Sequence, residues 1–92
     1  MDEICFEWDE DKEQINIKKH GIDFETAAYV FNDPNRIEYY DSEHSKVEDR
    51  YITVGLVGDL IVVVYTIREP KYRIISARIA KDKERKRYRD GY

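Results

Sequence analysis

Two runs of β-forming residues, separated by Gly58-Asp59, constrain the fold of this chain most. Residues 51–57 read Tyr-Ile-Thr-Val-Gly-Leu-Val, and residues 60–67 read Leu-Ile-Val-Val-Val-Tyr-Thr-Ile. Such β-branched and aromatic runs form strands, and a two-residue connection that contains glycine joins two strands as a hairpin. Because residues 60–67 are apolar without alternation, we expect a central strand, covered on both faces by the protein itself or on one face by helices and on the other by a partner.

Further strands and helices are expected on both sides of this hairpin. Asp9 and Asp23 are in the position of N-caps for two helices, the first of which runs over residues 10–20. Strands are also expected over residues 4–8, 36–40 and 72–79, and a last helix over residues 81–89. The order βααββββα predicts a single α+β domain over residues 1–92, with helices packed on one face of an antiparallel sheet.

The sequence also leads to expectations for the packing of the first helix, for the single cysteine and for metal binding. The helix over residues 10–20 has few apolar positions, so we expect Ile15 and the aliphatic stem of Lys12 to pack it. Cys5 is the only cysteine, which excludes an internal disulfide or a cysteine cluster for zinc, and we expect it in the core of the first strand. His44 lies in a polar loop without a neighbouring Cys or His, so neither a metal site nor a cofactor is expected.

Charge is distributed unevenly along the chain. Residues 1–49 contain 15 acidic and 5 basic residues, a balance of −10, whereas residues 50–92 contain 5 acidic and 11 basic residues, a balance of +6. The basic end of such a dipolar protein can attract a polyanion such as RNA. No apolar run approaches the roughly 18–20 residues of a membrane span, and the acidic start is unlike a signal peptide. We therefore expect a soluble, cytoplasmic protein with no membrane partner.

Two blocks of the sequence are similar to a known family. The first contains Phe6-Glu7-Trp8-Asp9, Lys19-His20-Gly21 and Asp33-Pro34, and the second contains Arg73-Ile74-Ile75-Ser76-Ala77-Arg78, Glu84-Arg85 and Tyr88. In this order and at this spacing they resemble the BrnT family of toxins from type II toxin-antitoxin modules, and the resemblance covers nearly the whole chain. Family members usually carry Thr or Ser at the position of Lys81, so the N-cap of the last helix must shift to Asp82 or be supplied by solvent.

The resemblance implies a RelE-like fold and a ribonuclease that shuts down translation. It also implies a BrnA-like antitoxin, whose ribbon-helix-helix domain dimerises and binds operator DNA, so that the toxin contacts DNA only through its partner. An alternative of a different class is a non-catalytic protein that binds the antitoxin and acts as a co-repressor. The net charge of −4 favours this alternative, because an acidic chain gains less from counterion release, whereas the basic end favours the ribonuclease.

Cleavage of RNA without a metal requires activation of a ribose 2′-hydroxyl, stabilisation of a pentavalent phosphorane and protonation of the leaving 5′-oxygen. Arginine suits the second task, because its planar fork binds phosphate oxygens through two hydrogen bonds. The candidates on adjacent expected strands are Arg50, Arg68, Arg73 and Arg78. Arg73 and Arg78 face opposite sides of an ideal strand, so both can line one site only if a bulge intervenes or the strand ends near Ala77.

For proton transfer the catalytic candidates are His20, Lys19 and Glu48, and the sequence leaves open which is the acid and which the base. His20 and Lys19 have a structural alternative, since basic residues at the end of a helix cap its carbonyls. Glu48 and Arg50 have the alternative of an exposed ion pair. Arg78, the strongest arginine candidate, has the alternative of a structural pair with an acid such as Glu48 or Glu84.

Outside the catalytic centre, RNA binding is expected from Arg73, Lys81, Arg85 and Tyr88. Tyr88 can stack on a base, but packing of the last helix on the sheet is an alternative of equal standing. The basic residues of that helix have the alternative of a solvated or partner-binding face. The sequence thus predicts a metal-independent endoribonuclease toxin that uses general acid-base chemistry and arginine stabilisation.

Overall fold

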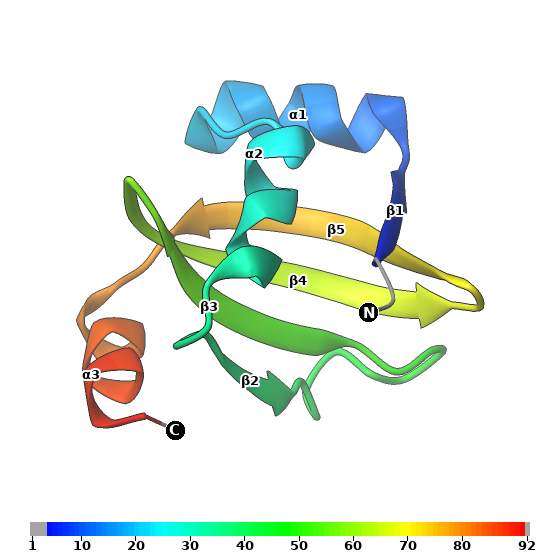
Figure 1. Cartoon of the computed structure of the whole chain (residues 1–92). Coiled ribbons are helices and arrows are strands. Elements are labelled where there is room, and N and C mark those ends of the chain that lie inside the picture. Colours follow the sequence, from blue (N-terminus) through cyan, green and yellow to red (C-terminus); the bar gives the residue numbers. More distant parts are fainter. Residues whose placement is uncertain (1–3, 92) are drawn as a thin grey trace.

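The computed structural model of the chain describes residues 4–91, and Figure 1 shows the arrangement of its elements. In chain order they are β1 (Cys5–Trp8), α1 (Glu10–His20), α2 (Phe24–Ala28), the 3₁₀ helix η1 (Tyr29–Asn32), β2 (Ile37–Tyr40), β3 (Tyr51–Val57), β4 (Asp59–Arg68), β5 (Lys71–Ile79) and α3 (Asp82–Asp90). The predicted α+β class and the predicted order of strands and helices are confirmed. Within the described residues, no helix has the length and apolar character needed to cross a membrane.

The five strands form one sheet in the order β1-β5-β4-β3-β2. Strands β2 to β5 pair antiparallel as successive neighbours, and the hairpin of β3 and β4 is confirmed. The prediction of a purely antiparallel sheet is wrong, because β1 pairs with residues Lys71–Ile74 of β5 in parallel. Pairing between the two ends of the chain is not encoded in the local pattern of either strand. The expected core position of Cys5 is also wrong, since its side chain is exposed at this edge of the sheet.

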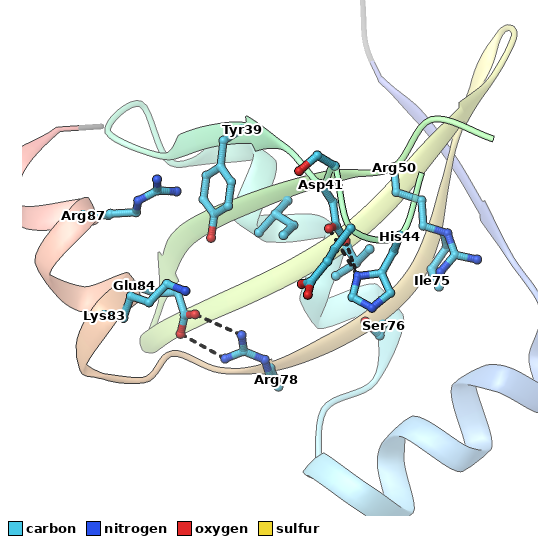
Figure 2. A pocket seen from close by; sticks show the side chains of 14 residues that line it. Tyr39, Asp41, His44, Arg50, Ile75, Ser76, Arg78, Lys83, Glu84 and Arg87 are labelled. Atoms are coloured by element: carbon cyan, nitrogen blue, oxygen red, sulfur yellow. Dashed lines mark hydrogen bonds and ion pairs between the residues drawn. The ribbon is translucent and has the colours of Figure 1, made fainter. Parts of the chain in front are cut away.

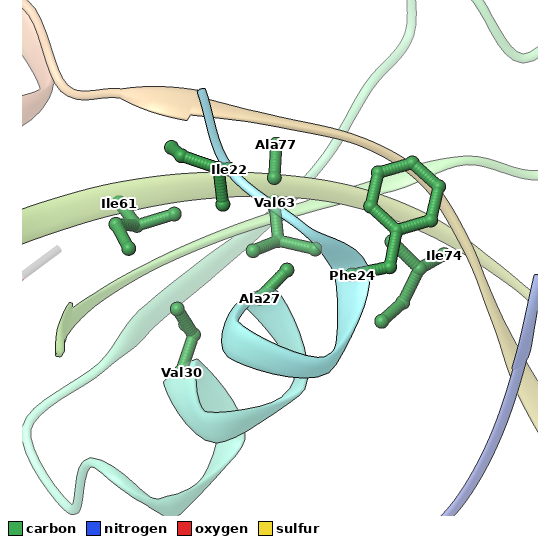
Figure 3. Packing of buried hydrophobic residues seen from close by; sticks show 8 residues of the cluster. All are labelled: Ile22, Phe24, Ala27, Val30, Ile61, Val63, Ile74 and Ala77. Carbon is green, nitrogen blue, oxygen red and sulfur yellow. The ribbon is translucent and has the colours of Figure 1, made fainter. Parts of the chain in front are cut away.

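Helices cover both faces of the sheet, which corrects the prediction that all helices pack on one face. One face is covered by α2 together with the residues just before and after it. Figure 3 shows the cluster that this packing buries: Ile22, Phe24, Ala27, Val30, Ile61, Val63, Ile74 and Ala77. The other face carries a second cluster around Val54 and Val62, against which Tyr88 of α3 packs. Val62 and Val63 are neighbours in β4 and belong to different clusters, so the central strand is buried on both sides, as its apolar sequence predicts.

An asparagine, rather than an apolar residue, attaches α1 to the sheet. The expected packing through Ile15 is wrong, because Ile15 is 64% exposed. Instead Asn16 is buried, its side-chain amide donates to the carbonyl oxygen of Ala77 at 2.9 Å, and its side-chain oxygen accepts from the Ala77 amide at 3.1 Å. β1 pairs only with the first residues of β5, so Asn16 takes the place of a neighbouring strand beyond that point and satisfies otherwise unpaired backbone groups.

A β-bulge at Ile75 determines which side chains of β5 share a face. Val64 of β4 pairs with Ser76, and the next residue, Tyr65, pairs with Ile74, so Ile75 has no partner in β4. As a result Arg73 and Arg78 pair with Thr66 and Val62, which lie on one face of β4. Of the two conditions derived from the sequence, an intervening bulge or a strand that ends near Ala77, the structure has the bulge.

Candidate functional site

A pocket of about 590 Å³ opens on the face of the sheet opposite α2, between α3 and the loop that joins β2 to β3. Figure 2 shows the side chains that line it. They are Tyr39, Asp41, Ser42, Glu43, His44, Arg50, Ile52, Val64, Ile75, Ser76, Arg78, Lys83, Glu84 and Arg87. We call this cavity the sheet pocket. Its residues come from four strands or their ends, one loop and one helix, so they converge only in the folded chain.

His44 and Asp41 form a hydrogen-bonded pair in the wall of the sheet pocket. The Nδ1 atom of His44 lies 3.0 Å from Oδ2 of Asp41, whose side chain is 10% exposed, whereas that of His44 is 63% exposed. A carboxylate only accepts hydrogen bonds, so Nδ1 is assigned the proton and Nε2 remains available to another group. Ser45 fixes the loop, because its hydroxyl donates to the Asp41 carbonyl oxygen at 2.6 Å and accepts from the Arg50 amide at 2.8 Å.

Three of the cations that have no carboxylate partner among the described residues line the sheet pocket. Among the residues that the structure describes, Arg50, Lys83 and Arg87 make no ion pair, and all three line the pocket. The Nε atom of Arg50 is buried and has no hydrogen-bond partner within residues 4–91. The guanidinium of Arg87 lies over the ring of Tyr39, 4.2 Å from its centroid. These cations have hydrogen-bond capacity to spare for an anionic ligand.

Arg78 lines the same pocket, and it forms the structural pair that the sequence left open. Its two terminal nitrogens donate to the two carboxylate oxygens of Glu84, each at 3.0 Å, as the dashed lines in Figure 2 indicate. Glu84 is buried and also accepts from the amide of Lys81 at 2.7 Å, so this carboxylate caps the start of α3 where the Lys81 side chain does not. The hydrogen bonds between the two side chains hold the pKa of the Glu84 carboxyl below its usual range and raise the pKa of the Arg78 guanidinium.

The remaining candidate arginines are neutralised by acids outside the sheet pocket. Arg68 lies 3.3 Å from Glu48, and Arg73 lies 3.2 Å from Glu7. Glu48 therefore pairs with Arg68 and not with Arg50, and it lines an adjoining hollow together with His44 and Arg50. Of the four candidate arginines, the structure places Arg50 and Arg78 in one pocket.

His20 and Lys19 lie apart from the sheet pocket, at the end of α1. With Lys12, Ile15 and Asn16 they line a smaller hollow of about 200 Å³, which reaches β5 at Ile75 and Ser76. The histidine that the sequence favoured is thus not the one beside the candidate arginines. His44 was considered only as a metal ligand, because a histidine in a polar loop has no pattern that indicates proton transfer. Its position in the same pocket as Arg50 depends on a loop and a strand pairing that only the fold shows.

Two of the expected RNA-binding residues, Arg85 and Tyr88, belong to α3, and both attach this helix to the rest of the domain. The hydroxyl of Tyr88 donates to Oδ2 of Asp33 at 2.6 Å, and this hydrogen bond raises the pKa of Tyr88. Arg85 lies 3.2 Å from Asp59, the first residue of β4. Tyr88 thus takes the packing role that the sequence left as an alternative, and Lys81 is exposed at the start of the helix.

Two further observations bear on function. Among residues 4–91, no group of three or more His, Cys, Asp or Glu side chains is arranged to hold a metal ion. A family model described as ribonuclease toxin, BrnT, of type II toxin-antitoxin system matches residues 8–84, a span that includes the sheet pocket up to Glu84 and all of α1 and β5. No curated protein matches the chain at a significant level.

Proposed function

The chain belongs to the BrnT family of ribonuclease toxins of type II toxin-antitoxin systems, and we propose that it is a metal-independent endoribonuclease whose active site is the sheet pocket. The observation that carries this proposal is the position of the Asp41–His44 pair in the same cavity as unpaired cations. Cleavage of RNA by its own 2′-hydroxyl requires a base for that hydroxyl, an acid for the leaving 5′-oxygen and fixed positive charge near the phosphorane, and the pocket holds side chains suited to each task.

In the proposed reaction, His44 Nε2 takes the proton of a ribose 2′-hydroxyl. The 2′-oxygen then forms a bond to the adjacent phosphorus, and the bond from phosphorus to the 5′-oxygen breaks, so the products carry a 2′,3′-cyclic phosphate and a 5′-hydroxyl. Lys83, the ammonium group on the α3 side of the pocket, donates the proton that the leaving 5′-oxygen needs. Asp41 keeps the imidazole in the required tautomer and stabilises its protonated form.

The phosphate is held by the arginines of the sheet pocket. Arg50 and Arg87 have free donors, and a guanidinium binds two phosphate oxygens at once, so they can stabilise the extra negative charge of the phosphorane. Arg78 contributes charge, but both of its terminal nitrogens are engaged by Glu84. Its role in the proposal is therefore to position α3, which carries Lys83 and Arg87, and to add to the positive potential.

We further propose that cleavage of cellular RNA by this pocket inhibits translation and that a BrnA-like antitoxin neutralises it. A type II toxin has a protein antitoxin as its partner. In the proposal this antitoxin covers the sheet pocket with acidic side chains, and its ribbon-helix-helix domain provides the contact with operator DNA. Support comes from the charge of the pocket, since covering Arg50, Lys83 and Arg87 removes the groups that would hold RNA.

The decisive experiment compares two variants of the only two histidines in the chain. His44→Gln should lower kcat for cleavage of a dinucleotide by about 10²- to 10⁴-fold, the contribution of a positioned general base. His20→Gln is matched in chemistry and lies outside the pocket. A loss confined to His44→Gln, with 2′,3′-cyclic phosphate termini on the wild-type product, supports the proposal. Loss of activity in His20→Gln alone would indicate that the active site lies at α1. Absence of cleavage by the wild-type protein would favour the non-catalytic co-repressor.

A further inference from the structure

The bulge in β5 joins the sheet pocket to the smaller hollow beside α1. Ile75, which has no partner in β4, and the adjacent Ser76 line both cavities. A ligand that fills the sheet pocket can therefore continue over these two residues, around the part of β5 that β1 does not cover, without crossing another element. Bulges often lie next to active sites, where they turn side chains and the strand edge toward a ligand.

We propose that this smaller hollow, which we call the α1 hollow, binds the RNA strand where it leaves the sheet pocket, with Lys12 and Lys19 as its phosphate contacts. The proposal rests on the proposed ribonuclease function and adds a second binding site to it. The two lysines are seven residues apart, so they project from the same side of α1, two turns from one another. Among the described residues neither lysine makes an ion pair, and none of the described residues that line the hollow carries a carboxylate.

The α1 hollow is rigid enough to guide a strand. Asn16 binds the backbone of Ala77 through two hydrogen bonds and the carbonyl oxygen of Ile22 through a third, at 3.0 Å. These bonds fix α1 against β5, so the spacing between the lysines and the sheet pocket is set by the fold. Side chains on a fixed helix position a ligand more accurately than side chains on a loop.

The chemistry of the hollow fits a nucleic-acid backbone better than a small anion. Its lysines are separated along the helix, as successive phosphates are separated along a strand, and ammonium groups bind phosphate as point charges without reading sequence. Ile15 is 64% exposed between the lysines, and it offers an apolar surface to a ribose or a base. Lys12 and Lys19 are in this view positioning residues, which act on the affinity for longer RNA and not on the chemical step.

The test compares Lys12→Gln/Lys19→Gln with the wild-type protein on two substrates, a dinucleotide and a single-stranded RNA of about ten nucleotides, a length within the range that one small domain covers. The double variant should raise KM for the longer RNA about tenfold, the scale of two exposed charge contacts, and leave its kcat unchanged. For the dinucleotide, which fills only the sheet pocket, kcat/KM should be unchanged. The slope of log affinity against log salt for the longer RNA should fall by about 1.4, since each contact with single-stranded RNA contributes about 0.7.

Lys18→Gln compared with Lys19→Gln provides the matched control, because the two lysines are adjacent and exposed but only Lys19 lines the hollow. Lys19→Gln should reduce the salt slope by about 0.7 and Lys18→Gln should not. Equal effects of the two single variants, or an equal loss on both substrates in the double variant, would overturn the α1 hollow as a binding site. Failure of the proposed function would give a different result: the wild-type protein would cleave neither substrate, or the His44→Gln variant would be as active as the wild type.

Discussion

Removal of Arg78 should destabilise the protein as well as reduce its activity, because Arg78 holds the buried carboxylate of Glu84. In the Arg78→Ala variant this carboxylate keeps the hydrogen bond from the amide of Lys81 and loses two from the guanidinium. An isolated charge in a buried position is costly, whereas replacing both partners of such a pair by neutral groups costs less. The pair therefore predicts a strongly non-additive double-mutant cycle.

The expected size of the effect depends on how exposed the two side chains are. Breaking a buried ion pair by removing one partner costs about 3–5 kcal/mol. The Glu84 side chain is 7% exposed but that of Arg78 is 33% exposed, so water can reach the site once the arginine is gone, and we expect about 2 kcal/mol. For a domain of this size each kcal/mol shifts Tm by about 4–8 °C, so Arg78→Ala should lower Tm by about 8–16 °C.

Thermal unfolding of four proteins, namely wild type, Arg78→Ala, Glu84→Gln and the double variant, tests this directly. The double variant should be more stable than Arg78→Ala, because glutamine leaves no charge unpaired.

The destabilisation caused by Arg78→Ala should also depend on pH. The pKa of Glu84 is lowered in the folded protein, so its ionic interactions stabilise the fold above the ordinary carboxyl pKa of about 4.3 and are lost as pH falls through the lower, folded value. The difference in Tm between wild type and Arg78→Ala should accordingly shrink below pH of about 4.

Arg78→Ala with the wild-type Tm at neutral pH would refute this reasoning, as would additive effects in the cycle. Activity has to be measured well below the Tm of the variant, where all molecules are folded. We expect a loss of about tenfold or more under those conditions, because α3 carries Lys83 and Arg87 and loses its anchor to β5.

Three other predictions follow from the site and the fold. RNA cleavage by the purified protein should survive EDTA, because the proposed chemistry uses side chains alone; loss in EDTA that magnesium restores would contradict it. RNA and the antitoxin should compete for the sheet pocket, measured as displacement of labelled RNA; a ternary complex that still cleaves RNA would show that the antitoxin binds elsewhere. Gly55→Ala should cost about 1–3 kcal/mol, because the added Cβ would lie 2.8 Å from Cγ1 and 3.0 Å from the carbonyl oxygen of Val30 in η1; an unchanged Tm would mean that η1 shifts freely.

Local features of the sequence predicted the helices and strands. The features that the sequence did not predict depend on pairing between distant parts of the chain. The N-caps are local, and both are confirmed: Asp9 accepts from the amide of Asp11 at 2.8 Å, and Asp23 accepts from that of Thr26 at 2.6 Å. The parallel pairing of β1 and the position of α3 on the second face depend on which edges and faces remain uncovered after the rest has folded. Neither strand period nor helix period contains that information.

The candidate site was predicted incompletely for a related reason. Counting charge along the sequence assigned RNA binding to the basic second half, yet Lys12, which lines the α1 hollow beside β5, belongs to the acidic first half. Conversely Arg68 and Arg73 belong to the basic half but pair with Glu48 and Glu7.

A surface potential is set by charges that remain unpaired, and pairing is a property of the fold. Arg50 illustrates the difference. It was one of four candidate arginines in the sequence, and the structure distinguishes it because the other three pair with carboxylates, whereas Arg50 pairs with none among the described residues. A guanidinium whose Nε has no acceptor among the described residues makes few hydrogen bonds within the protein, and a phosphate bound to its terminal nitrogens would supply charge-assisted hydrogen bonds that the protein itself does not provide.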